Sequence, residues 1–254
     1  MIFLPNRLLG RLPSKQDPRT LQLANYRTPT LPTPPPSRRW DLAVPTWLQA
    51  GNDRLGNCVI ATAAHELLCM RANASGATNP ITDAAVIELS YAMDAENGYS
   101  ILDRLKWWQH KGMWSNKLGA YAAIGPEEGD LTQSAIDIFG CADIGINLPR
   151  AWQHNEIWDT GHGAAYRAGS WGGHSVPIVA YDKDYFYVVT WGYVQQMTYD
   201  AYATYCDERY AIIDQAWLKP DGRTPSGFDM AALQADLTAL AAQDPADQPS
   251  PRNA

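Results

Sequence analysis

The pattern of hydrophobic and polar positions divides the chain into a helical part followed by a part rich in strands. The run after Asn57 is rich in Ala and Leu and holds no Gly or Pro, which predicts a helix that begins at Cys58 with Asn57 as its N-cap. Further helices are predicted over residues 82–93, 100–110 and 130–139.

Strand patterns dominate the second half. Residues 173–192 contain two β-rich runs around a polar turn centred on Lys183, which predicts a hairpin. Residues 202–214 predict another strand, and residues 229–243 an amphipathic closing helix. Pro177 removes a ladder donor from the first run and predicts an edge strand or a bulge there. Helices first and strands second indicate an α+β fold with two lobes.

Composition adds a division into three segments. The chain has 254 residues, of which 46% are hydrophobic, enough for one large domain or two half-domains. Residues 1–39 form a Pro-rich basic arm with seven Lys or Arg and one acid, which predicts an extended segment. Such an arm is usually a solvated tail, and the alternative is a segment that docks on an acidic protein partner or a second copy. Residues 40–243 are the predicted domain, and residues 244–254 a disordered tail.

Charge and cysteine content exclude several classes of protein. A net charge of −7 without a basic stripe in the body argues against nucleic-acid binding. No apolar run is long enough to cross a membrane, and no signal-peptide core follows the start. Four widely spaced cysteines indicate a reducing compartment. His65 and Cys69 could share a metal ion, but two ligands are too few, so neither a metal nor a cofactor is expected.

Cys58 and His174 are the candidate catalytic pair. A cysteine at a helix N-terminus faces the positive end of the helix dipole, which lowers the pKa of its thiol. A histidine that reaches the sulfur would complete the nucleophile of an acyl-transfer enzyme. The Cys58 backbone N–H and the side chain of Asn52 could then hold the oxyanion.

Residues 37–66 resemble the start of the mature domain of papain-like cysteine peptidases. Gly56 and Cys58 match the Gly and the catalytic Cys of the motif that opens the family's central helix, and Asn52 stands where the family has its oxyanion Gln. The resemblance implies a papain-like fold, with a helical N-terminal lobe, an antiparallel β C-terminal lobe and the active-site cleft between them. It also implies a peptide or protein substrate.

Two later segments extend the resemblance. Residues 97–99 look like the family's loop that binds the substrate backbone, which implies that role for Gly98 and Tyr99. Residues 173–192 look like the segment that carries the catalytic histidine, which implies His174 as general base and then acid. Gly173 and Trp191 in this segment are further candidates for substrate binding.

The family's Asn that orients the imidazole is missing. If the segment is aligned with the family on Trp191, the position of this Asn falls on Val189. If it is aligned on His174, the position falls on Thr190. A hairpin centred on Lys183 pairs residues whose numbers sum to 366, which places Thr190 diagonal to His174 and on the same face. A shift of one residue would reverse this. We therefore favour Thr190, through its hydroxyl, as the residue that orients the imidazole.

Other departures keep three functional hypotheses open. Asn52 is one methylene shorter than Gln, and the family's helical propeptide has no counterpart in the short arm. The first hypothesis is a cysteine peptidase or amidase. The second is a weakened or inactive papain-like fold that serves as a phage virion or interaction protein through its arm, because the sequence also resembles phage and prophage members. The third is amide transfer of the transglutaminase kind. The expected location is accordingly bacterial cytoplasm or phage virion.

Overall fold

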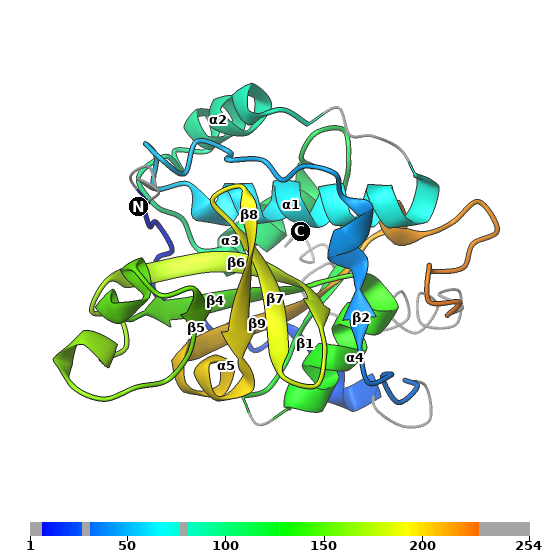
Figure 1. The fold of residues 1–254 in the computed structure, drawn as a ribbon. Coiled ribbons are helices and arrows are strands. Elements are labelled where there is room, and N and C mark those ends of the chain that lie inside the picture. The colour runs from blue at the N-terminus through cyan, green and yellow to red at the C-terminus, as the bar shows by residue number, and fades with distance from the viewer. Residues whose placement is uncertain (1–6, 27–30, 77–80, 127, 229–254) are drawn as a thin grey trace, which may run out of the picture.

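A nine-stranded sheet forms the centre of the molecule (Figure 1). The structure, a computed structural model, describes residues 7–26, 31–76, 81–126 and 128–228. The strand order is β1-β3-β9-β4-β6-β7-β8-β5, with β2 beside β6. The strands are β1 (Leu21–Gln22), β2 (Arg38–Arg39), β3 (Ala120–Ala123), β4 (Ala142–Leu148), β5 (Ile157–Trp158), β6 (Gly172–Tyr181), β7 (Tyr185–Thr190), β8 (Tyr193–Thr198) and β9 (Cys206–Ile213).

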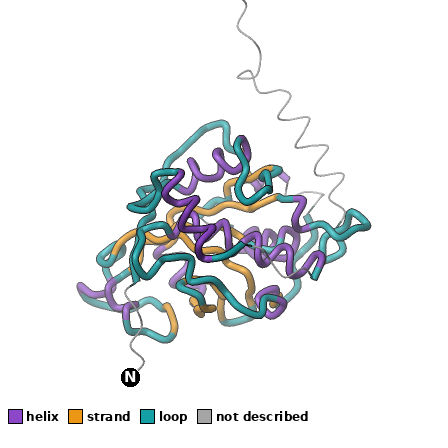
Figure 2. Tube along the Cα trace, turned by 90° about the horizontal axis from the view of Figure 1, so that it is seen from above, coloured by secondary structure: helices purple, strands orange, loops and turns teal. Residues whose placement is uncertain are grey.

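The α-helices of the described residues are α1 (Cys58–Ser75), α2 (Asp83–Ala92), α3 (Ile101–His110), α4 (Gly129–Phe139) and α5 (Tyr199–Tyr205). They pack against both faces of this sheet: α1, α2 and α3 lie above it in Figure 1 and in front of it from above in Figure 2, and α4 and α5 lie on the other side. Short 3₁₀ helices span Leu23–Tyr26, Trp40–Ala43, Arg150–Gln153, Ala164–Tyr166 and Gln215–Trp217.

The sheet separates two hydrophobic clusters. Side chains of a strand alternate between its faces, so Val188 of β7 enters one cluster and Val189 the other. The first cluster gathers α4, α5 and one face of the sheet. The second cluster surrounds α1, α2 and α3, and α1 is buried along most of its length. The burial of α1 within the second cluster holds the start of this helix close to the sheet.

Helix starts follow the predicted positions, with one difference in capping. Helix α1 begins at Cys58, as predicted, but Asn57 makes no side-chain cap bond. Its amide donates instead to the Ala50 carbonyl and to Ser90 Oγ, both at 2.9 Å, and thereby fastens the loop before α1. Ordinary capping occurs at α2, where Thr82 accepts from the Ala85 N–H.

The predicted hairpin is present as β6 and β7. Ile178 pairs with Val188, the register with sum 366, while a bulge after Ile178 shifts the pairs nearer the turn by one residue. Of the two alternatives predicted from Pro177, the edge strand is wrong, because β6 lies between β4 and β7, whereas a bulge does occur close by, after Ile178. Pro177 itself pairs with Asp143 of β4, and the pairs between β6 and β7 begin at Ile178.

Several elements do not follow from the sequence pattern alone. Strands β3 and β4 and helix α5 have no distinct periodic signal, and packing against neighbours distant in sequence decides them. The predicted closing helix over residues 229–243 and the tail 244–254 lie outside the described residues.

The N-terminal arm folds onto its own body. Strand β1 pairs with β3, and β2 pairs with β6. Leu23 is buried in the first cluster at 1% exposure. The described arm residues therefore make contacts within their own chain.

A buried ion-pair triad joins the helices to the sheet. Arg104 of α3 donates to Glu66 Oε2 of α1 at 3.2 Å and also to Asp143 Oδ2 of β4. All three side chains are fully buried. Burial raises the pKa of both carboxyls, and the guanidinium opposes that rise. The arginine is thus the charge that makes two buried carboxylates tolerable.

We expect Arg104→Met to lower the free energy of unfolding by about 3–5 kcal/mol at neutral pH, because it leaves two buried carboxyls without their cation. The deficit should shrink as the pH falls, since these carboxyls have raised pKa values and take up protons in the native state first. Urea unfolding at two pH values measures both effects. Arg54→Met, at an exposed position, is the matched control, and an equal loss there would refute the triad's role.

Candidate active site

The first turn of α1 lies against the middle of β6. Cys58 is 1% exposed, and a hydrogen bond from the backbone of Ser175, the residue after His174, reaches its thiol. One turn further along α1, the hydroxyls of Ser175 and Thr62 hydrogen-bond at 3.1 Å. The helix start and the histidine-bearing strand, far apart in sequence, therefore meet.

The imidazole of His174 is fixed through one nitrogen and free at the other. Nε2 lies 2.8 Å from Thr190 Oγ1, and both residues are buried. Nδ1 is buried and has no hydrogen-bond partner among the described residues. Val189, the other candidate for the residue that orients the imidazole, points into the second hydrophobic cluster, on the other face of the sheet. The contact between His174 and Thr190 is the one that the hairpin register predicts.

Trp191 stacks on the imidazole from a tight turn. Its ring lies 4.7 Å from the His174 ring, with 11° between the planes. Thr190 pairs with Tyr193, so Trp191 and Gly192 form a two-residue turn, with φ values of 46° and 84°. Such a turn matches the twist of the strands but is unusual for a bulky residue. The stacked ring and the Thr190 hydroxyl together hold the imidazole in one orientation.

Residues 8–12 of the arm, here named the covering segment, lie over the site. Backbone hydrogen bonds tie the segment to the body: Leu8 N–H to Asn52 O (3.0 Å), Tyr99 N–H to Gly10 O (2.8 Å), Arg11 N–H to Gly173 O (3.2 Å) and Leu12 N–H to Tyr99 O (2.9 Å). A Cβ on Gly10 would lie 1.6 Å from the Gly56 carbonyl oxygen, so the two backbones touch beside Cys58. A short, non-helical arm thus takes a covering position that the sequence did not predict.

Burial shifts the pKa values of both candidate catalytic groups toward their neutral forms. Burial raises the pKa of the Cys58 thiol, although backbone hydrogen bonds from Ser175, Gly10 and Val59 oppose it. Burial, assisted by the nearby Arg11 charge, lowers the pKa of His174 to about 3. The predicted fall of the Cys58 pKa is therefore wrong for this covered state, because desolvation outweighs the helix N-terminus.

Asn52 is buried beside Cys58, but its amide is engaged. Its Nδ2 donates to Asn57 Oδ1, and its backbone carbonyl receives the Leu8 N–H. An oxyanion role would need the second amide hydrogen or a rotation of the side chain. That role stays a prediction.

The structure thus brings several of the residues selected from the sequence into contact. His174, Thr190 and Trp191 contact one another, and Cys58 begins the helix that packs against β6, the strand of His174. Gly173 and the loop at Gly98 and Tyr99, chosen as binding sites for a substrate backbone, flank the covering segment, and Gly173 and Tyr99 bind its backbone. Gly10 and Arg11, which contact this region, were not selected from the sequence, and nothing in the basic, Pro-rich arm distinguishes Arg11 from its other arginines.

No metal site emerges from the described part of the chain. His65 Nε2 lies 2.9 Å from the Leu48 carbonyl oxygen, which satisfies this buried ring as an ordinary core histidine. No group of three or more His, Cys, Asp or Glu is arranged to hold an ion within residues 7–228 as far as they are described.

Comparison with known proteins places this geometry in context. No known protein family matches the sequence, and no curated protein matches it. Among solved structures, xylellain, a cysteine protease from Xylella fastidiosa, is similar with a TM-score of 0.63 at 14% identity, covering 83% of this chain and 97% of that one. The fold is that of papain-like cysteine proteases.

Two further structures support this assignment of the papain-like fold. The ragweed pollen cysteine protease Amb a 11 in its proform has a TM-score of 0.55 at 13% identity, over 75% of this chain and 70% of that one. Procathepsin L 3 from Tenebrio molitor has a TM-score of 0.53 at 14% identity, over 79% and 75%. The predicted α+β papain-like fold of two lobes is confirmed.

We expect Thr190→Val to lower kcat/KM for peptide hydrolysis by about tenfold or more, because it removes the hydroxyl that orients the imidazole and keeps the side-chain volume. KM should change little. The pH dependence of kcat/KM should shift, because the His174 imidazole loses its hydrogen bond to the Thr190 hydroxyl. Thr190→Ser restores the hydroxyl and should recover most of the rate. Equal losses in the Val and Ser variants would indicate a packing role only.

Proposed function

We propose that this protein is a papain-like cysteine peptidase or amidase whose site is covered in the described state. The observation that carries the proposal is the meeting of Cys58, at the start of α1, with the strand that holds His174, an imidazole fixed through Nε2 and free at Nδ1. The papain-like fold supports a peptide as the class of substrate.

The reaction requires that the covering segment leaves first. Water then reaches both groups, the Cys58 proton passes to His174 Nδ1, and the thiolate attacks the peptide carbonyl carbon. His174 returns the proton to the leaving amine as the C–N bond breaks, which leaves a thioester on Cys58. Water, deprotonated by His174, attacks the thioester, and the acid and the free thiol are released. The Cys58 N–H, with Asn52 after rotation, would stabilise the oxyanion of each tetrahedral intermediate.

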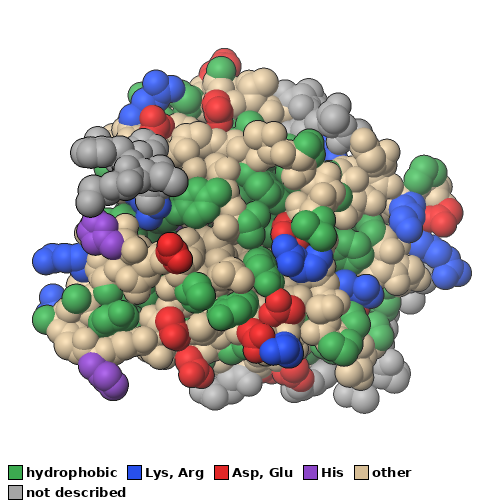
Figure 3. Space-filling view, in the orientation of Figure 1, with side chains coloured by type: hydrophobic (Ala, Val, Ile, Leu, Met, Phe, Trp, Pro, Cys, Tyr) green, Lys and Arg blue, Asp and Glu red, His purple; other side chains and the backbone are tan. Residues whose placement is uncertain are grey.

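The surface and the cysteines are consistent with this proposal. On the face in Figure 3, Lys and Arg side chains are interspersed with Asp and Glu. All four cysteines are free thiols, which supports a reducing compartment. No helix in the described residues is both long and apolar enough for a bilayer crossing.

A peptidyl chloromethyl ketone, which alkylates an activated cysteine with loss of chloride, tests the proposal. We expect one adduct per chain, mapped to Cys58 by peptide mass spectrometry, and cleavage of an unfolded protein such as casein. Cys58→Ala should remove both. If neither adduct nor cleavage is found, and both are still absent after Gly10→Ala has displaced the arm, the result would favour the second hypothesis, in which an inactive papain-like fold serves as an interaction protein. Product masses separate hydrolysis from amide transfer, because transfer adds the acceptor amine where hydrolysis adds water.

A further inference from the structure

Residues 96–99, here named the docking loop, bind both the loop before α1 and the covering segment. The carbonyl of the first residue of the docking loop accepts from the Gly56 N–H at 2.7 Å. Its last residue, Tyr99, donates its N–H to Gly10 O at 2.8 Å and accepts from the Leu12 N–H at 2.9 Å. One short stretch of backbone therefore connects the start of the central helix to the arm that covers it.

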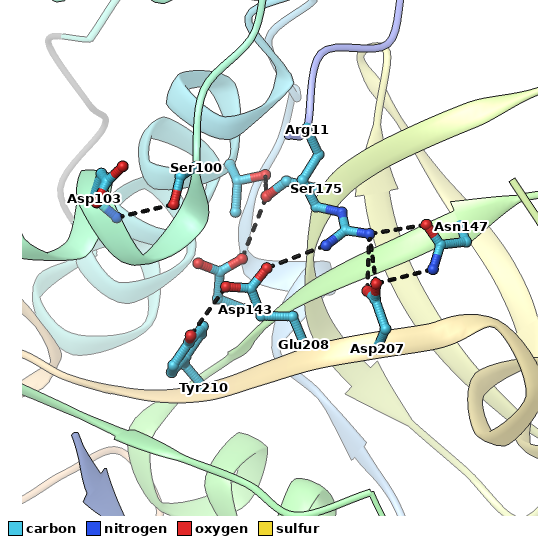
Figure 4. A network of polar contacts seen from close by, with 10 residues as sticks. Arg11, Ser100, Asp103, Asp143, Asn147, Ser175, Asp207, Glu208 and Tyr210 are labelled. Carbon is cyan, nitrogen blue, oxygen red and sulfur yellow. Dashed lines mark hydrogen bonds and ion pairs between the residues drawn. The ribbon is translucent and has the colours of Figure 1, made fainter. Parts of the chain in front are cut away.

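The backbone of the docking loop is fixed at its far end and packed on two sides. Ser100 follows the loop and is buried, and its hydroxyl accepts an N–H of α3 at 3.3 Å, which caps that helix (Figure 4). A Cβ on Gly98 would lie 3.0 Å from Gly10 O, and a Cβ on Gly56 would lie 3.4 Å from the backbone carbonyl carbon of Asn97. An additional backbone atom within the loop would therefore have to displace one of these neighbours.

The docking loop holds Asn97 and Gly98, the single Asn–Gly pair of the sequence. Asn97 is exposed, and its side-chain amide donates to Oε1 of the neighbouring Glu96 at 3.0 Å. The Gly98 nitrogen lies 3.4 Å from Ala95 O, which is long for a hydrogen bond, so this nitrogen is weakly held. Because glycine has no Cβ, its nitrogen can approach the asparagine side chain without steric hindrance. The pair therefore favours cyclisation of this thermolabile residue type.

Cyclisation and hydrolysis would lengthen the backbone. The Gly98 nitrogen attacks Cγ of Asn97, and the side-chain nitrogen leaves as ammonia with the proton that the Gly98 nitrogen gives up. Water then opens the cyclic imide. Where water attacks the backbone carbonyl carbon of Asn97, the chain continues through Cγ, with one additional methylene and a new carboxylate. The product is isoaspartate, and water is the only co-reactant.

We propose that Asn97 is a modification site whose conversion to isoaspartate loosens the covering segment and exposes Cys58. The additional methylene lies between the carbonyl that binds Gly56 and the N–H that binds Gly10, so the loop cannot keep both contacts. Loss of the two hydrogen bonds between Tyr99 and the segment raises the fraction of open molecules about tenfold or more. The proposal goes beyond the peptidase assignment, because neither the modification nor the exposure needs catalysis.

Ageing of the full chain at mildly alkaline pH and physiological temperature tests the modification. Peptide mass spectrometry should find conversion at Asn97 before any other asparagine, and a protein isoaspartate methyltransferase should label the same peptide. Asn97→Gln should stay unlabelled, because its longer side chain would have to close a larger ring. If a synthetic peptide of residues 94–100 forms isoaspartate under these conditions and the folded chain does not, the proposal is overturned.

The effect on the covering segment is measured on the aged protein. Ion exchange isolates the chains that have gained one negative charge, and the methyltransferase gives their isoaspartate content. We expect iodoacetamide to alkylate Cys58 in the isoaspartate form about tenfold or more faster than in fresh protein, with loss of hydrogen-exchange protection at residues 8–12.

Freshly prepared Asn97→Asp is the matched control, because it carries the new charge without the additional methylene. It should react like the unmodified chain. Unchanged alkylation of Cys58 in the isoaspartate form would overturn the proposal, and so would an equal rise in Asn97→Asp, since charge alone would then account for the exposure.

Discussion

Gly10→Ala is expected to raise the rate at which iodoacetamide alkylates Cys58 by at least about tenfold at neutral pH. The new methyl group would lie 1.6 Å from the backbone oxygen of Gly56, and a backbone cannot yield as a flexible side chain can. Residues 8–12 must therefore move away, and the sulfur that they bury becomes accessible. Mass spectrometry of tryptic peptides over a time course measures the rate at each cysteine.

Gly129→Ala is the matched control, because a Cβ on Gly129 would meet nothing within 4 Å. It should leave the alkylation of Cys58 unchanged. Cys69, Cys141 and Cys206 are buried as well and should stay unreactive in both variants. Slow alkylation of Cys58 in Gly10→Ala, with the amides of residues 8–12 still protected from hydrogen exchange, would show that the segment is not displaced by this substitution.

His174→Ala, introduced into Gly10→Ala, is expected to reduce kcat/KM for peptide cleavage by about 10³-fold or more. The variant removes the base that takes the Cys58 proton and the acid that protonates the leaving amine. It should also return the pH dependence of Cys58 alkylation toward that of an isolated thiol, because no imidazolium stabilises the thiolate. Steady-state rates and alkylation at several pH values measure the two effects.

The matched control is His162→Ala, at an exposed loop position, which should retain the activity of the Gly10→Ala parent. Melting curves of both variants check that the fold is intact. A His174→Ala variant that still cleaves peptides at the parent rate would remove His174 from the mechanism.

Local patterns were sufficient to predict the helix starts and the hairpin register. Cys58 begins α1 because an apolar run follows a loop, and the contact of His174 with Thr190 follows from the alternation of strand residues around a short turn. Both depend on residues close together in sequence, where periodicity is informative.

Contacts between distant residues were not predictable in this way. Arg11 meets Asn147, Asp207 and Glu208, which are 136 to 197 positions away, and nothing in the arm's composition indicates such a partner. Burial of Cys58, which the Arg11 charge only partly opposes, explains why the predicted direction of the thiol pKa shift was wrong. The argument from the helix N-terminus assumed an open sulfur, whereas a segment from the other end of the chain buries it.

Because the covering segment is part of the same polypeptide, dilution cannot release it. Under the proposed function it would compete with every substrate as a tethered ligand at high effective concentration. The apparent affinity for a peptide equals the intrinsic affinity of the site multiplied by the fraction of molecules whose segment has lifted. If about one molecule in a hundred were open, the peptide would bind about a hundredfold more weakly than to a fully open site. Under the proposed function, turnover would thus be governed by the equilibrium between the docked and the lifted states of residues 8–12.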